Sequence, residues 1–197
     1  MLNKPSLKTY ILSVFGTLFF LIGLGLGSYL VSFQKHQILD TNFTISQSLA
    51  FGNKPVMVTF YTLSYICLII LVLLRSGSKN LLVIKVFLLL LSYSLLITII
   101  WITTYRDIIE HYAFAGVIFI SNLIFQLLTI YSFYNYISKK KTLIATGLLQ
   151  VIIVILLVLF LLLGVYSNLN IYDKLFASFE NITVVSMGIT ILALGFI

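Results

Sequence analysis

Six long apolar runs divide the chain, and only short polar stretches separate them. A helix needs about 20 apolar residues, at about 1.5 Å per residue, to cross a hydrocarbon core of roughly 30 Å. The runs are continuous rather than alternating, which is typical of membrane helices and not of membrane strands. The predicted spans are 10–33, 56–74, 81–104, 112–137, 143–166 and 175–197. The sequence therefore predicts an all-α polytopic membrane protein, a single bundle of six transmembrane helices without a separate soluble domain.

The composition excludes a soluble protein. Only 9% of the residues are charged and 61% are hydrophobic, whereas a soluble domain carries about 25% charged residues. The net charge of +7 does not indicate nucleic-acid binding, because the basic residues flank several spans instead of gathering on one face. The single cysteine, Cys67, excludes an intrachain disulfide and a cysteine zinc cluster. We expect no cofactor and no metal.

The distribution of basic residues predicts the orientation, since cytoplasmic flanks are enriched in Lys and Arg. With the N-terminus inside, eight of the 12 basic residues lie on the cytoplasmic side: Lys4, Lys8, Arg75, Lys79, Lys85, Lys139, Lys140 and Lys141. Arg75 and the lysines at 139–141 are interpreted as cytoplasmic anchors. Lys85 lies inside a span, and we expect its long side chain to snorkel to the headgroups. Both termini are predicted to be cytoplasmic.

The last span must include an acidic residue if it is to be long enough to cross the membrane. Residues 182–197 alone would cover only about 24 Å, too short for the hydrocarbon core. A helix that begins near Leu175 is long enough, but it takes Glu180 into the outer leaflet, where a carboxylate needs a partner. The alternative is a shorter, mismatched helix with Glu180 at the interface.

The fourth span carries the expected partner. Its polar stripe should face the bundle interior, and it comprises His111, Ala115, Phe119, Asn122 and Gln126 at helical spacing. The predicted polar pocket consists of Glu110, His111, Asn122, Gln126 and Glu180. A structural hydrogen bond between His111 and Glu180 is preferred to a metal site or acid/base pair, because no HExxH spacing and no nucleophile motif occur. Glu110 also fits a plain capping role at a helix N-terminus. No residue is assigned as catalytic.

Two short patterns complete the analysis. Gly23, Gly25 and Gly27 imitate a nucleotide fingerprint, but they lie in a lipid-length helix and are interpreted as packing glycines. The small face of that span, which includes Gly16 and Gly23, should admit another helix of the same chain. Asn42 begins a glycosylation sequon in the predicted outer loop.

Four short motifs in order along the chain carry a family resemblance. They are the first span, Ile45 and Ser46 in the outer loop, His111 with Ala115 and Phe119, and Ala177 with Glu180. With these motifs the chain resembles the Frag/DRAM/Sfk family of six-helix membrane proteins, which includes the damage-regulated autophagy modulators and proteins of GPI-lipid remodelling. Gln47 and Asn181 depart from that pattern, at positions where the family has an acid and an aromatic residue.

The resemblance implies a non-enzymatic role in membrane lipid organisation, trafficking or autophagy. Membrane lipids, and other membrane proteins, are the expected partners. The membrane is an endomembrane or the plasma membrane in a eukaryote and the inner membrane in a bacterium. Two alternatives remain open: an intramembrane lipid-modifying enzyme that uses Glu110, His111 and Glu180, and a small-solute transporter.

Overall fold

The computed structural model describes most of the helical parts of the chain. The described residues are 4–34, 54–76, 78–102, 108–134, 145, 147–156, 158–159 and 170–196. Within these ranges, the side chains of 26–34, 101–102, 108–113, 170–181 and 184 lie outside the description.

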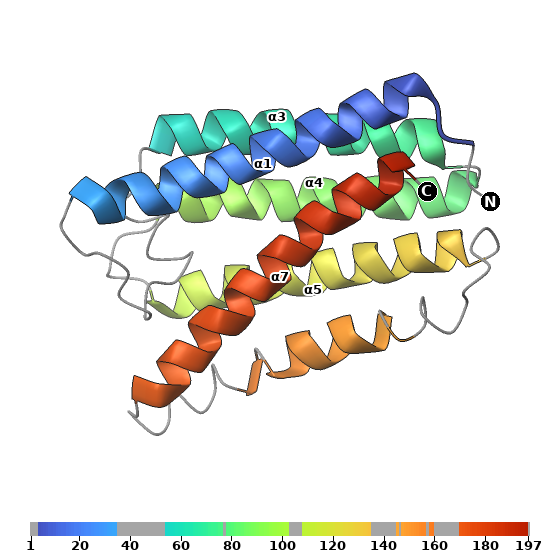
Figure 1. The fold of residues 1–197 in the computed structure, drawn as a ribbon. Coiled ribbons are helices and arrows are strands. Elements are labelled where there is room, and N and C mark those ends of the chain that lie inside the picture. Colours follow the sequence, from blue (N-terminus) through green and yellow to red (C-terminus); the bar gives the residue numbers. More distant parts are fainter. Residues whose placement is uncertain are drawn as a thin grey trace.

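The described residues form helices and no strand, so the prediction of an all-α fold is confirmed (Figure 1). The long helices are α1 (Leu7–Gln34), α3 (Lys54–Arg75), α4 (Lys79–Ile102), α5 (Ile108–Phe133) and α7 (Asn170–Phe196). A shorter apolar helix covers Gly147–Leu156. Among the described residues, four helices are long and apolar enough to cross a membrane, over Leu7–Gly25, Lys54–Arg75, Lys79–Ile100 and Phe114–Phe133. The chain is an integral membrane protein.

The last helix is longer than the predicted span. α7 runs for 27 residues from Asn170 to Phe196, about 40 Å at the rise of an α-helix. The expectation that this helix begins before Ile182 is therefore confirmed, although it begins five residues earlier than Leu175. Its length places Glu180 on the helix, while the side chain of Glu180 lies outside the described residues.

Local sequence explains where the first helix begins. The Thr9 backbone amide donates to Ser6 Oγ at 3.4 Å, and the Ser6 amide donates to Thr9 Oγ1 at 2.9 Å. This reciprocal pair satisfies two of the amides that a helix N-terminus leaves without a partner. α1 consequently begins directly after Ser6 rather than at Tyr10.

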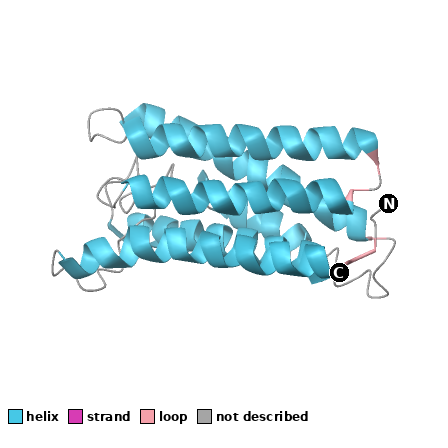
Figure 2. Cartoon of the chain, turned by 90° about the horizontal axis from the view of Figure 1, so that it is seen from above, coloured by secondary structure: helices cyan, strands magenta, loops and turns pink. Residues whose placement is uncertain are grey.

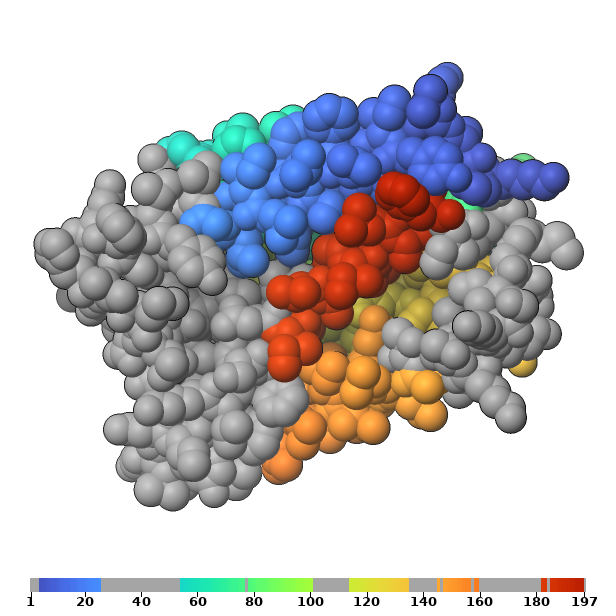
Figure 3. Space-filling view, viewed as in Figure 1, coloured from blue at the N-terminus to red at the C-terminus, as the bar shows by residue number. Residues whose placement is uncertain are grey.

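The helices form an antiparallel bundle in which α7 runs obliquely across the others (Figures 1 and 2). α1 packs against α3 and α7, α3 also packs against α4, and α4 packs against α5. The core between them contains Leu68, Leu71, Leu89 and Phe125, each no more than 1% exposed. In the space-filling view the side chains of α7 lie directly beside those of α1 (Figure 3).

The packing glycines of α1 perform the predicted role within the chain. A Cβ added at Gly16 would lie 3.1 Å from Cys67 Cβ, and one added at Gly23 would lie 3.3 Å from Phe60 Cβ. Both neighbours belong to α3, so the small face admits a helix of the same chain. Gly25 has nothing within 4 Å of an added Cβ. Gly25 therefore does not take part in this contact. The surroundings of Gly27 lie outside the described side chains.

Side-chain contacts bring several helix ends to one end of the bundle. Thr9 Oγ1 donates to the Gly195 carbonyl at 3.5 Å, and the rings of Tyr10 and Phe196 are 5.0 Å apart. The start of α1 therefore lies beside the end of α7. Contacts of α3, α4 and α5 at the same end involve Arg75 and Lys85 and are described below.

Candidate functional site

The structure tests only part of the predicted polar pocket. Asn42 lies outside the described residues, and the side chains of Glu110, His111 and Glu180 lie outside the described side chains. The pairing of His111 with Glu180 stays a prediction. Two members of the predicted stripe, Asn122 and Gln126, are described on α5.

Asn122 ends a hydrogen-bonded chain that links three helices. Ser92 Oγ on α4 donates to Asn122 Oδ1 at 3.0 Å, and the hydroxyls of Tyr65 and Ser92 are 2.9 Å apart. Because Ser92 gives its only hydroxyl proton to Asn122, Tyr65 on α3 must donate to Ser92. All three residues lie near the middle of their helices, so this Tyr65–Ser92–Asn122 chain crosses the centre of the bundle.

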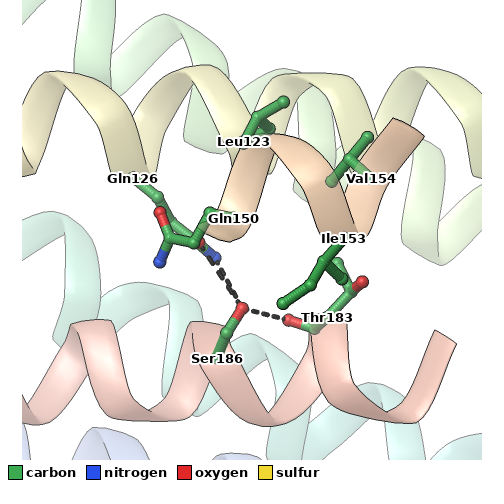
Figure 4. A pocket seen from close by; sticks show the side chains of 7 residues that line it. All are labelled: Leu123, Gln126, Gln150, Ile153, Val154, Thr183 and Ser186. Carbon is green, nitrogen blue, oxygen red and sulfur yellow. Dashed lines mark hydrogen bonds between the residues drawn. The ribbon is translucent and has the colours of Figure 1, made fainter. Parts of the chain in front are cut away.

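Gln126, one turn further along α5, faces a different neighbour. Its Nε2 atom donates to Ser186 Oγ at 3.3 Å (Figure 4). It also donates to Met187 Sδ at 3.8 Å, and both partners lie on α7. Only 2% of Gln126 is exposed. The expectation that these amides face neighbouring helices is thus met for both residues. Asn122 bonds to α4 and Gln126 bonds to α7.

A small cavity lies beside Gln126, between α5, α7 and the Gly147–Leu156 helix (Figure 4). Its volume is about 10 Å³. The lining residues are Leu123, Gln126, Gln150, Ile153, Val154, Thr183 and Ser186. The Gln150 Oε1 atom is buried and accepts no hydrogen bond in the described part of the chain.

Arg75, the predicted cytoplasmic anchor, has a buried side chain. The side chain is 1% exposed, and its Nε atom donates to the Leu194 carbonyl at 3.0 Å. Leu194 lies in the last turn of α7, where carbonyls have no partner within their own helix and the helix dipole favours a cation. The residue that was predicted to lie at a cytoplasmic flank therefore attaches α7 to α3.

The prediction that Lys85 snorkels to the headgroups is wrong. Lys85 is 1% exposed, and its Nζ atom donates to Ser132 Oγ on α5 at 2.8 Å. Ser132 in turn donates to the Leu128 carbonyl at 2.7 Å, which leaves its oxygen lone pairs available to the ammonium group. The Lys85 ammonium group bonds to this acceptor on the facing helix instead of extending to the membrane surface.

Sequence reasoning missed Ser92 and Ser186, which bond to Asn122 and Gln126, and Gln150, which lines the cavity. Serines are common in membrane helices and often bond to their own backbone, as Ser94 does to Leu91, so Ser92 and Ser186 gave no distinct signal. Gln150 did give one, since it is the one Asn or Gln residue in the predicted span 143–166.

The arrangement can hold helices in register and can bind a very small polar species beside Gln150. The described residues contain no group of three or more His, Cys, Asp and Glu residues that could hold a metal ion. No family model, curated protein or solved structure matches the chain. The resemblance to the Frag/DRAM/Sfk family stays a prediction from its short motifs.

Proposed function

We propose that this protein crosses the membrane six times with both termini in the cytoplasm, and that it acts in membrane lipid organisation without catalysing a reaction. The observation that carries this proposal is the division of side chains between the inside and the outside of the bundle. Arg75, Lys85 and Gln126 are at most 2% exposed and bond to neighbouring helices, whereas large apolar side chains cover the outside.

The outward-facing side chains suit contact with lipid. Val83 and Phe87 on α4 are 67% and 62% exposed, and Ile189 on α7 is 62% exposed. Apolar side chains of this size are stable on a surface that lipid solvates, and a bundle with this surface orders the acyl chains around it.

The direction of the helices supports six crossings. α1 begins, α3 ends and α7 ends near one another, as the contacts of Thr9 with Gly195 and of Arg75 with Leu194 require. α4 begins near the end of α5, through Lys85 and Ser132, and follows α3 after a short turn. α5 and α7 therefore end at the same end of the bundle. We infer that the chain returns through the Gly147–Leu156 helix, which lies between α5 and α7 in the sequence.

The two alternatives receive less support from the described residues. The cavity of about 10 Å³ has room for about one water molecule, which gives a transported solute no site there. The enzyme alternative depends on Glu110, His111 and Glu180 and rests on the sequence alone.

The proposal is tested with the purified full chain reconstituted in vesicles of mixed phospholipids. We expect a polarity-sensitive membrane dye to report a change in lipid order that grows with protein density, with lipid masses unchanged and no flux of trapped solute. Lipid products that disappear in His111→Ala but persist in His36→Ala, with both variants folded, would support the enzyme instead. Solute flux would support the transporter. An unchanged lipid order at high protein density would refute the proposal.

A further inference from the structure

The cavity beside Gln150 is lined by hydrogen-bonding groups from three separate helices. Gln126 comes from α5, Ser186 from α7, and Gln150 from the Gly147–Leu156 helix (Figure 4). The remaining lining side chains include the apolar Leu123 and Val154. The cavity thus has polar side chains in its lining, unlike a packing defect that apolar side chains alone surround.

The donors of Gln126 and Ser186 are already committed. Gln126 Nε2 uses its two hydrogens toward Ser186 Oγ and Met187 Sδ. Ser186 has one hydroxyl hydrogen, and its shortest acceptor is the Thr183 carbonyl at 2.7 Å. Gln126 Oε1 lies 3.5 Å from the same hydroxyl, at the limit of a hydrogen bond.

The amide oxygens of Gln126 and Gln150 consequently lack a close donor among the described residues. Gln150 Oε1 is buried and accepts no hydrogen bond within the described residues, and Gln126 Oε1 accepts at most one long bond. A buried amide oxygen without a donor is costly in an apolar surrounding, so such groups are bonded to protein or to ordered water. The site needs a ligand that brings two donors in the volume of one small molecule.

We propose that the cavity binds one water molecule that donates to Gln150 Oε1 and to Gln126 Oε1. A water needs about 10–15 Å³ and two to four polar partners, and the cavity supplies a volume of about 10 Å³ with amide and hydroxyl groups. The water joins the Gly147–Leu156 helix to α5 and thereby to α7. A sodium ion fits less well, because the Gln126 amide hydrogens also face this region and a cation requires a shell of oxygens alone.

The first experiment fills the cavity. Val154, which is 7% exposed and lines the cavity, is changed to Ile, and thermal unfolding of the full chain is measured in detergent. If water occupies the site, Val154→Ile displaces it, leaves the two amide oxygens without a donor and lowers the Tm. In a Gln150→Leu background the same change should no longer lower the Tm, because Gln150 Oε1, one of the two acceptors of the water, is already absent. The matched control is Val158→Ile, at an outward position that is 41% exposed, and it should leave the Tm unchanged.

A dry cavity predicts the opposite sign. Val154→Ile would then fill a void and raise the Tm or leave it unchanged. Either result for Val154→Ile overturns the proposal. A Tm that rises in sodium chloride relative to choline chloride, and loses that dependence in Gln150→Leu, would assign the site to a cation and likewise overturn it.

If Val154→Ile does not fold, the native chain still decides the question. A density map of the wild-type protein at a resolution that shows ordered water should contain a peak about 3 Å from Gln150 Oε1. A map of that quality without such a peak would overturn the proposal.

Discussion

At the scale of single residues, two buried cations distinguish this chain from an apolar bundle with charges only at its ends. Arg75 bonds to a backbone carbonyl and Lys85 to a serine hydroxyl, and each is 1% exposed. A Lys that snorkels tolerates Arg, because both reach the headgroups. A Lys enclosed between helices does not, since the guanidinium group is larger and needs a different set of acceptors.

We therefore expect Lys85→Arg to lower the stability of the folded chain by about 1–3 kcal/mol through overpacking. Lys85→Met should be less harmful, because it removes a buried charge while Ser132 keeps its bond to the Leu128 carbonyl. Thermal or denaturant unfolding in detergent measures both. Lys79→Arg is the control, at an exposed position in the first turn of α4. A Lys85→Arg variant as stable as wild type would restore the snorkelling interpretation.

Glycine positions give a second test of residue-scale packing. A Cβ added at Gly195 would collide with the Ser13 side chain and lie 2.8 Å from the Thr9 carbonyl oxygen, whereas one at Gly116 would meet nothing within 4 Å. Gly195→Ala should push α7 away from α1 and cost about 1–3 kcal/mol. Gly116→Ala should leave stability unchanged or raise it by up to about 1 kcal/mol, since Ala favours a helix. Equal unfolding temperatures for the two variants would contradict the α1–α7 contact.

At the scale of helices, the Tyr65–Ser92–Asn122 chain defines how α3, α4 and α5 align. Moving one helix lengthwise by a single residue displaces its side chains by about 1.5 Å and turns them by about 100°, which would break these bonds. Packing of similar aliphatic side chains alone distinguishes such registers poorly, because many registers bury the same apolar area. The polar chain selects one of them.

This role predicts energetic coupling between helices. Ser92→Ala and Asn122→Leu should show an interaction energy of about 0.5–1.5 kcal/mol in a double-mutant cycle, in the range found for hydrogen bonds between membrane helices. The comparison pair is Ser92→Ala with Thr190→Val, because within the described part of the chain Thr190 bonds to the Ser186 carbonyl of its own helix. That pair should be additive. Additivity of the Ser92 and Asn122 changes would show that the bond does not hold the two helices together.

At the scale of the whole molecule, three basic residues, two of them buried, lie at the same end of the bundle. Arg75, Lys85 and Lys79 lie toward the end where α1 begins and α7 ends, which Figure 1 shows near both termini. Positive residues favour the cytoplasmic side. This end is therefore the one that we expect in the cytoplasm.

Cysteine labelling tests the orientation in the background Cys67→Ala, which removes the single native thiol. Cysteines introduced at Ser78 and Lys140 should be protected from an impermeant reagent added outside intact cells, and one at Asn42 should react. Permeabilised cells supply the control, since all three positions should then react. Labelling of Ser78 and protection of Asn42 in intact cells would reverse the proposed orientation.

The sequence by itself determined the helical class, the integral membrane character, the approximate bounds of α1, α3, α4 and α5, and the early start of the last helix. These properties depend on hydrophobicity and length along one segment, which are local. The small face of α1 was also predictable, because glycines at helical spacing leave room for another helix whichever helix that is.

Only the tertiary structure decided where the polar side chains of the spans point. The sequence predicted that Lys85 and Arg75 reach the membrane surface, whereas Lys85 bonds to Ser132 and Arg75 to the Leu194 carbonyl. Asn122 and Gln126 were predicted to line one pocket, and they bond to two different helices, α4 and α7. The physical reason is that a polar group in lipid bonds to the nearest available partner on another helix. Which helix lies nearest follows from the packing of the whole bundle and is not encoded in any single span.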